Sequence, residues 1–165
     1  MRNVKWIFVV LLSSAFFFLS FVEEGHHAEG LNEGDIAPTF IARSLDGTTK
    51  SIQNEESNYV LVSFWASYDA ASRMNNVACS NEVKRLGNKV ALVSVSFDEF
   101  ESVVQETVKH DKIDIPNCYV ELKGEDSELF KTYRLAQGFG NYLLDSDGVI
   151  IAKNILPSDI QKLIN

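Results

Sequence analysis

The stretch Tyr59-Val-Leu-Val-Ser-Phe-Trp-Ala-Ser-Tyr-Asp-Ala-Ala-Ser-Arg-Met74 decides the fold, because it predicts a strand, a turn and a helix in direct succession. Residues 59–65 are mainly β-branched and aromatic, which is typical of a strand buried on both faces. Two small residues end this run, and Asp69 is a residue type that caps helix starts. The alanines at 70 and 71, followed by Met74 and Val77 at helical spacing, favour a helix.

Within this stretch, Phe64-Trp65-Ala66-Ser67-Tyr68-Asp69-Ala70-Ala71-Ser72-Arg73 resembles the active-site segment of envelope thioredoxin-like thiol-disulfide oxidoreductases. That segment runs Phe-Trp-Ala-Ser/Thr-Trp-Cys-x-x-Cys-Arg. Asp69 stands at the position of the attacking cysteine, and Ser72 at that of the resolving cysteine. The resemblance implies a thioredoxin-like protein of the redoxin type with a degenerate active site.

The two substitutions remove the reactive atoms of that chemistry. A thioredoxin-type site needs a low-pKa thiolate at a helix N-terminus and a second sulfur that releases the mixed disulfide. We therefore expect no catalytic residue at Asp69 or Ser72, and expect Asp69 to stabilise the helix start by about 1 kcal/mol. An alternative makes Asp69 a general base for a Ser72 nucleophile. It is weaker, because no His or Lys lies near in sequence and a capping carboxylate has a lowered pKa.

The N-terminus carries a targeting segment. Arg2 and Lys5 precede an apolar run at 6–22 whose only polar residues are serines. This pattern is typical of a secretory signal peptide or a membrane anchor, and small residues are scarce near its end, which leaves an uncleaved anchor open. The charges before the run predict that the remainder faces away from the cytoplasm, in the periplasm or cell envelope, with membrane contact only through this anchor.

Residues 23–33 are polar, and we expect them to form a solvated linker. Its adjacent histidines, His26 and His27, lack the further ligands that a closed metal site needs, so we expect no metal and no other cofactor. The formal net charge of the chain is −8. With no basic stripe in the sequence, this charge argues against nucleic acid as a partner.

The segment after the linker predicts one α/β domain over residues 34–165. Gly34-Asp-Ile-Ala-Pro-Thr-Phe40 resembles the Gly-x-x-Ala-Pro-x-Phe opening of the same family and its peroxiredoxin neighbours, and an Asp-Gly turn at 46–47 predicts a hairpin. We expect Asp98-Glu99 to cap a helix with an apolar stripe and His110 near its end. The remaining expected elements are strands at 89–97, 117–122, 141–145 and 149–153 and helices at 127–135 and 157–164. This order is that of a thioredoxin fold, a central mixed sheet flanked by helices, with an N-terminal β-hairpin extension.

A second part of the family's redox site has also changed. Tyr142-Leu-Leu-Asp-Ser-Asp-Gly-Val-Ile150 resembles the family's Phe-Leu-Ile-Asp-x-x-Gly-x-Ile, and counting back places Phe139 where relatives carry a cis proline beside the dithiol. A cis bond before a residue other than proline costs about 2.5 to 4 kcal/mol. We therefore expect a trans peptide at Phe139 and a reshaped groove.

Cys79 and Cys118 are the two cysteines of the chain. Cys79 lies on the apolar stripe of the predicted central helix, and Cys118 in a predicted strand. We expect buried free thiols, since cysteine packs as a small hydrophobe, although pairing of the two stays open in an exported protein.

Two functions follow from these patterns. The first is a module in the cell envelope that binds a protein or peptide through Trp65, Tyr68, Arg73 and Phe139, without redox activity at the usual site. The alternative is a thiol-dependent oxidoreductase or antioxidant enzyme that uses Cys79 or Cys118. The exposure of the sulfurs separates the two, because a catalytic thiolate must be accessible.

Overall fold

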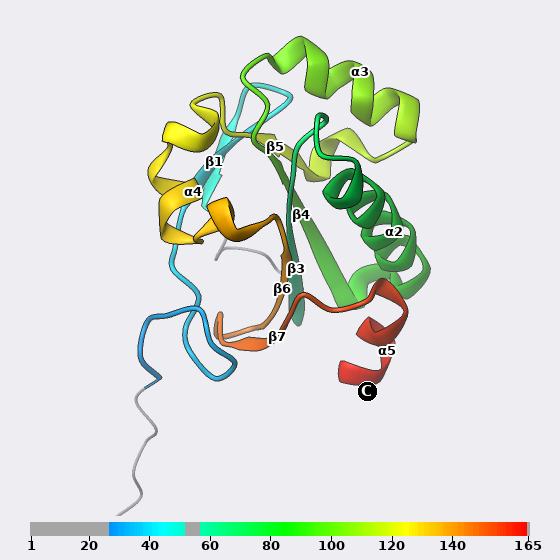
Figure 1. Cartoon of the computed structure of the whole chain (residues 1–165). Helices are drawn as coiled ribbons and strands as arrows, with labels where there is room; N and C mark the ends of the chain where they lie inside the picture. The colour runs from blue at the N-terminus through cyan, green and yellow to red at the C-terminus, as the bar shows by residue number, and fades with distance from the viewer. Residues whose placement is uncertain (1–26, 52–56, 165) are drawn as a thin grey trace, which may run out of the picture.

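The computed structural model of the chain describes residues 27–51 and 57–164 (Figure 1). The predicted signal peptide or anchor at 6–22 and the start of the predicted linker lie outside these residues. Within the described ranges, no helix has the length and apolar character needed to cross a membrane.

Seven strands form one sheet in the order β2-β1-β5-β4-β3-β6-β7. The strands are β1 Ile41–Ser44, β2 Thr49–Ser51, β3 Tyr59–Trp65, β4 Val90–Ser96, β5 Cys118–Val120, β6 Asn141–Asp145 and β7 Ile150–Lys153. The α-helices are α2 Ala70–Leu86, α3 Glu101–Asp111, α4 Glu128–Thr132 and α5 Ile160–Leu163. The predicted architecture, a mixed sheet flanked by helices with an N-terminal hairpin, is confirmed.

The central strand β3 explains why its sequence is apolar without alternation. It pairs in parallel with β4 over its whole length and antiparallel with β6 on its other edge. Helices cover both faces of the sheet, with α2 and α5 on one side and α4 on the other (Figure 1). Every residue of β3 after Tyr59 is buried, as the sequence predicted.

The two faces have different cores. Leu61 and Leu143 from the sheet pack with Cys79 and Val83 of α2 and Ile160 of α5. The opposite face holds a cluster rich in aromatic rings, including Phe64, Phe97, Phe130, Tyr133 and Tyr142. Ring pairs in this cluster meet edge to face, for example Phe64 and Tyr133 at 4.7 Å between centroids, a geometry that aromatic pairs favour.

Helix α3 differs from the sequence prediction. It begins at Glu101 after Phe100, and no side chain caps it. Val104 and Val108 of the predicted stripe are fully buried, but Phe100 is 67% exposed and Val103 is 42% exposed. Helix α3 therefore contacts the core through Val104 and Val108, and the first part of its apolar stripe remains at the surface.

The described residues before Gly34 are hydrogen-bonded to the rest of the domain. Gly30 N–H donates to the carbonyl oxygen of Ile36 at 3.0 Å, and Ile36 forms an isolated bridge with Val149. The Lys153 ammonium also donates to the Leu31 carbonyl oxygen at 2.9 Å. The described part of the predicted linker is therefore bonded to the edge of the sheet.

The two last predicted helices are shorter than expected. Helix α4 ends at Thr132, because Arg134 adopts a left-handed conformation (φ 54°) and a 3-10 turn follows at Leu135–Gln137. The closing segment starts as a 3-10 turn at Pro157–Asp159 before α5.

Candidate functional site

The start of α2 holds the two residues at the degenerate cysteine positions. Asp69 is the N-cap, and its Oδ1 accepts the Ser72 N–H at 2.7 Å. The Ser72 hydroxyl donates to the Asp69 carbonyl oxygen at 3.1 Å and is buried. Hydrogen bonding to the carboxylate by the Ser72 backbone N–H, and after it by the Ser72 side chain, holds the pKa of Asp69 below its ordinary value. The predicted capping role of Asp69 is confirmed, and both side chains are engaged with the helix start.

Replacing Asp69 with alanine is expected to destabilise the protein by about 0.5 to 2 kcal/mol, because α2 loses its N-cap. Urea denaturation monitored by circular dichroism measures this difference. Asn is a comparably good cap, so Asp69→Asn is the matched control and should retain most of the stability at pH 7. A gain in stability for Asp69→Ala would show that the aspartate strains the helix start.

The same prediction has a pH dependence. A carboxyl whose pKa is lower in the folded state than in the unfolded state adds stability above its unfolded pKa, and this stability is lost as the pH falls through the folded value. The pKa of Asp69 is lowered in this way. The difference between the parent and Asp69→Ala should therefore shrink as the pH falls below about 4.

Asp98 ties the loop before α2 to the end of β4. It is 5% exposed, and its Oδ2 accepts the Ser67 N–H at 2.9 Å and the Ser96 hydroxyl at 2.6 Å. The Ser67 hydroxyl donates to the other carboxylate oxygen. The prediction that Asp98 caps α3 is therefore wrong, because its carboxylate is bonded to Ser67 and Ser96 instead. The polar residues at 94, 96 and 98, spaced by two along a buried strand, were the sequence signal for a hydrogen-bonded face.

Tyr68 and Phe139 form an aromatic ridge beside the start of α2. Tyr68 is 62% exposed, and its ring centroid lies 6.4 Å from that of the half-buried Phe139. Phe139 packs inward against Phe97 and Phe130 at 5.8 and 6.1 Å. No cis peptide occurs in the described part of the chain, so the predicted trans bond at Phe139 is confirmed. Position 139 is therefore filled by a ring anchored in the core.

Trp65 is not a surface residue, which corrects its prediction as a binding residue. It is 0% exposed, because odd-numbered residues of β3 point toward the face covered by α2 and α3. Its indole N–H donates to the Ser94 hydroxyl at 2.9 Å, and that hydroxyl donates to Asn76 Oδ1 at 2.9 Å. Trp65 therefore supports the loop from within the core.

Arg73 is engaged in a structural ion pair. Its Nε and a terminal nitrogen each donate to a different carboxylate oxygen of Asp111 at 2.7 Å. The Asp111 side chain is 9% exposed, and the guanidinium holds the pKa of this carboxyl below its ordinary value. The predicted position of His110 near the end of α3 is confirmed. Arg73 joins α2 to α3, so its charge is not free for a ligand.

The two thiols are buried and unpaired with each other. Cys79 and Cys118 are both free and 0% exposed, as predicted. Burial raises the pKa of each thiol to about 12. At neutral pH such groups are thiols, whereas disulfide exchange requires an accessible thiolate. Among the described residues, no group of three His, Cys, Asp or Glu side chains is placed to hold a metal ion.

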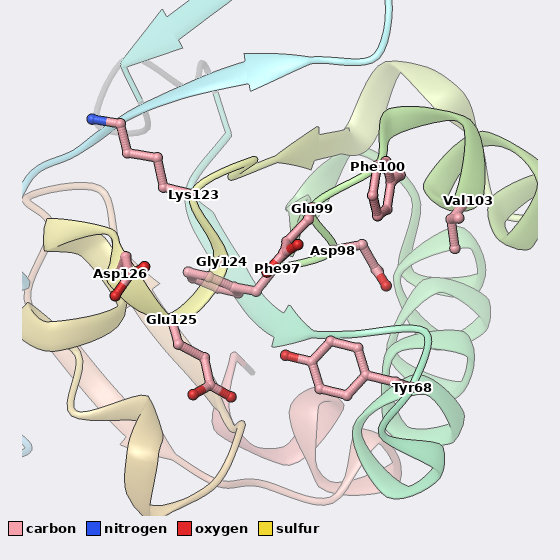
Figure 2. A pocket seen from close by; sticks show the side chains of 10 residues that line it. All are labelled: Tyr68, Phe97, Asp98, Glu99, Phe100, Val103, Lys123, Gly124, Glu125 and Asp126. Atoms are coloured by element: carbon pink, nitrogen blue, oxygen red, sulfur yellow. The ribbon is translucent and has the colours of Figure 1, made fainter.

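Several hollows surround the ridge. A cleft of about 360 Å³ separates the start of α2, with Asp69 and Ser72, from the segment around Phe139. On the other side of Tyr68 lies a hollow of about 470 Å³ (Figure 2), which we call the acidic groove. The residues that line the acidic groove are Tyr68, Phe97, Asp98, Glu99, Phe100, Val103, Lys123, Gly124, Glu125 and Asp126. No pattern in the sequence indicated this groove, because its walls come from three separate segments.

Comparison with known proteins places this geometry in a family. The chain is 30% identical over 123 residues to the thioredoxin-like protein YneN of Bacillus subtilis (strain 168), covering 73% of this chain and 70% of YneN. A crystal structure of a thioredoxin-like protein from Parabacteroides distasonis ATCC 8503 is 43% identical, with a TM-score of 0.74 over 83% of this chain and 97% of that chain.

A thiol-disulfide oxidoreductase from Bacteroides fragilis NCTC 9343 is 25% identical, with a TM-score of 0.69 over 78% of this chain and 99% of that chain. No family model matches the sequence. The similarity in sequence and the shared fold lead to one conclusion: the chain belongs to the thioredoxin-like family and has the fold of its thiol-disulfide oxidoreductases.

Proposed function

We propose that this thioredoxin-like domain is a binding module without dithiol activity, which holds a protein or peptide segment against the surface around Tyr68. The observation that carries the proposal is the start of α2. Asp69 and Ser72 occupy the two cysteine positions and satisfy each other's backbone groups. The fold is retained while the atoms that exchange disulfides are absent.

Exposed apolar side chains around the ridge support binding. Tyr68 is 62% exposed and Met74 on α2 is 72% exposed, and a hollow of about 500 Å³ lies beside both. On the far side of Tyr68, Phe100 is also mostly exposed. Apolar side chains that gather at one surface and remain uncovered are typical of interaction sites.

The proposed location is the cell envelope. It rests on Arg2 and Lys5 ahead of the apolar run at 6–22, the charge order of an exported or anchored chain. A partner at the Tyr68 surface would then be a protein or peptide of the same compartment. Fractionation of cells that express the full chain tests this location.

The second candidate is a thiol-dependent enzyme that uses Cys79 or Cys118. Its sulfurs are enclosed by α2, α3 and the sheet, and no accessible cysteine lies in the described part of the chain. A reaction at either sulfur requires that the core open first. We therefore favour binding over thiol chemistry.

The full chain is expected to reduce insulin disulfides no faster than dithiothreitol alone, because neither helix-start position carries sulfur and both thiols have a pKa of about 12. Insulin precipitation followed by turbidity measures the rate. The Cys79→Ala/Cys118→Ala variant, checked for folding by circular dichroism, should give the same background. Turnover that this variant loses would assign redox chemistry to the buried thiols and overturn the proposal.

A further inference from the structure

The acidic groove carries a strong local charge of one sign. Four carboxylates, those of Asp98, Glu99, Glu125 and Asp126, line it beside one cation, Lys123. Figure 2 shows the Lys123 ammonium pointing away from the other labelled side chains. The interior of the groove is therefore negative.

Three of these carboxylates are free to meet a ligand. Glu99, Glu125 and Asp126 are exposed, and none of their side chains forms a salt bridge or hydrogen bond with another residue in 27–51 or 57–164. The fourth, Asp98, is buried and held by Ser67 and Ser96, with no cation bonded to it. The negative charge of the groove also acts on Tyr68. Burial, and after it the charges of Glu125, Asp98, Asp69 and Glu99, raise the pKa of the Tyr68 hydroxyl.

Aromatic and apolar side chains complete the groove. Tyr68 and Phe100 are 62% and 67% exposed, and Val103 lies beside Phe100 on α3. The Glu125 segment can approach Phe97 because Gly124 has φ +51°, and a Cβ there would lie 3.3 Å from the Phe97 carbonyl oxygen. Two exposed rings and a set of carboxylates in one hollow suit a cation with an apolar stem, since ring faces and anions both attract cations.

We propose that the acidic groove binds an arginine or lysine side chain of a partner polypeptide, with the cationic head among Glu99, Glu125 and Asp126 and the apolar stem against Tyr68 and Phe100. This inference rests on the proposed binding function and specifies its partner as a basic segment flanked by apolar residues. Charge complementarity favours this occupant. A second copy of this chain is a poor one, because the net charge of each copy is −8.

Three matched peptides test the proposal on the full chain, kept in a non-ionic detergent because of its apolar run at 6–22. The probes are acetyl-Gly-Leu-Arg-Leu-Gly-amide and the same peptide with citrulline or glutamate in place of arginine, each with a neutral fluorescent label. Fluorescence anisotropy gives each Kd. We expect the arginine peptide to bind about tenfold tighter than the citrulline peptide at low salt, and this ratio to fall as salt rises.

Variants locate the effect in the groove. Glu99→Gln/Glu125→Gln should weaken the arginine peptide about tenfold and leave the citrulline peptide within about twofold. The control Glu33→Gln/Asp147→Asn removes two exposed carboxylates that do not line the groove and should change neither Kd. A Tyr68→Ala variant should weaken both peptides, because it removes the shared apolar wall.

The outcomes separate the two proposals. Equal Kd values for the arginine and citrulline peptides, or no effect of Glu99→Gln/Glu125→Gln, would overturn the basic-segment inference. If Tyr68→Ala still weakened peptide binding in that case, the proposed binding function would stand. Absence of binding by all three peptides at millimolar concentration would overturn this inference too. Insulin reduction by the parent chain would instead overturn the proposed function, whatever the peptide charge.

Discussion

Changing Asp69 and Ser72 together to cysteine is expected to give a chain that closes a disulfide between the new sulfurs and reduces insulin faster than the parent chain does. The two residues already meet at the helix start, because Asp69 Oδ1 accepts the Ser72 backbone N–H at 2.7 Å and the Ser72 hydroxyl donates to the Asp69 carbonyl oxygen at 3.1 Å. Positions three apart on a helix place their Cβ atoms about 5 to 6 Å apart, and a disulfide needs about 4 Å, which a small backbone shift supplies. The helix N-terminus lowers the pKa of the first thiol, which is the attacking group.

Free-thiol titration, the redox potential and insulin turbidity measure the result. The single variants Asp69→Cys and Ser72→Cys are the controls and should form no disulfide at this site. The double variant should be a poor catalyst, because Phe139 anchors the neighbouring segment through its contacts with Phe97 and Phe130. Adding Phe139→Pro should raise the rate and lower the stability.

Two results would contradict this reasoning. If the double variant closes no disulfide, the correspondence of Asp69 and Ser72 with the cysteine positions is wrong. If it matches a natural thioredoxin without Phe139→Pro, the ring at 139 does not restrict the substrate groove.

Replacing Asp98 with alanine is expected to destabilise the protein by about 2 to 4 kcal/mol, as buried hydrogen bonds to a charged acceptor are strong and their donors are costly to leave unpaired. The carboxylate is 5% exposed and accepts three hydrogen bonds, two from Ser67 and one from Ser96. Its loss also frees the loop that carries Tyr68. A lower urea midpoint with an unchanged denaturant slope would report this change.

The neighbouring Glu99 supplies the matched control for Asp98. It is exposed and forms no side-chain bond within the described ranges, so Glu99→Ala should alter stability by about 0.5 kcal/mol or less. Asp98→Asn keeps an acceptor oxygen and should lie between the two. Equal stability for Asp98→Ala and Glu99→Ala would mean that the buried carboxylate costs as much to desolvate as its hydrogen bonds return.

Local patterns in the sequence were sufficient for the central part of the fold. The apolar run at 59–65 gave β3 with its observed bounds, and the spacing after Asp69 gave the start of α2. The predicted strand at 141–145 also matches β6. Asp69 caps the helix that begins at the next residue, and the apolar composition of residues 59–65 and 141–145 indicates burial whichever elements cover them. A short window of sequence was therefore enough to predict these elements.

The parts of the site that depend on distant partners were not predictable in this way. The sequence predicted that Trp65 ends strand β3, but it did not show that α3 covers the side chain of Trp65, because α3 is distant in sequence. Arg73 meets Asp111 across 38 positions, and Asp98 meets Ser67 across 31. From the sequence alone, Arg73 was predicted to lie on a binding surface and Asp98 to cap a helix. The true partner of each charge is distant in sequence, and many oppositely charged or polar residues could have filled that role.

The N-cap at Asp69 also bears on how this protein can evolve. A variant with cysteine only at position 69 would lose the cap and have no second sulfur at position 72. A variant with cysteine only at position 72 would keep the cap but have no attacking thiol at position 69. Selection for redox activity rewards neither intermediate, and selection for stability opposes the first. A cysteine pair at this helix start therefore requires both substitutions together, because the first substitution alone removes the N-cap of α2 and supplies no second sulfur.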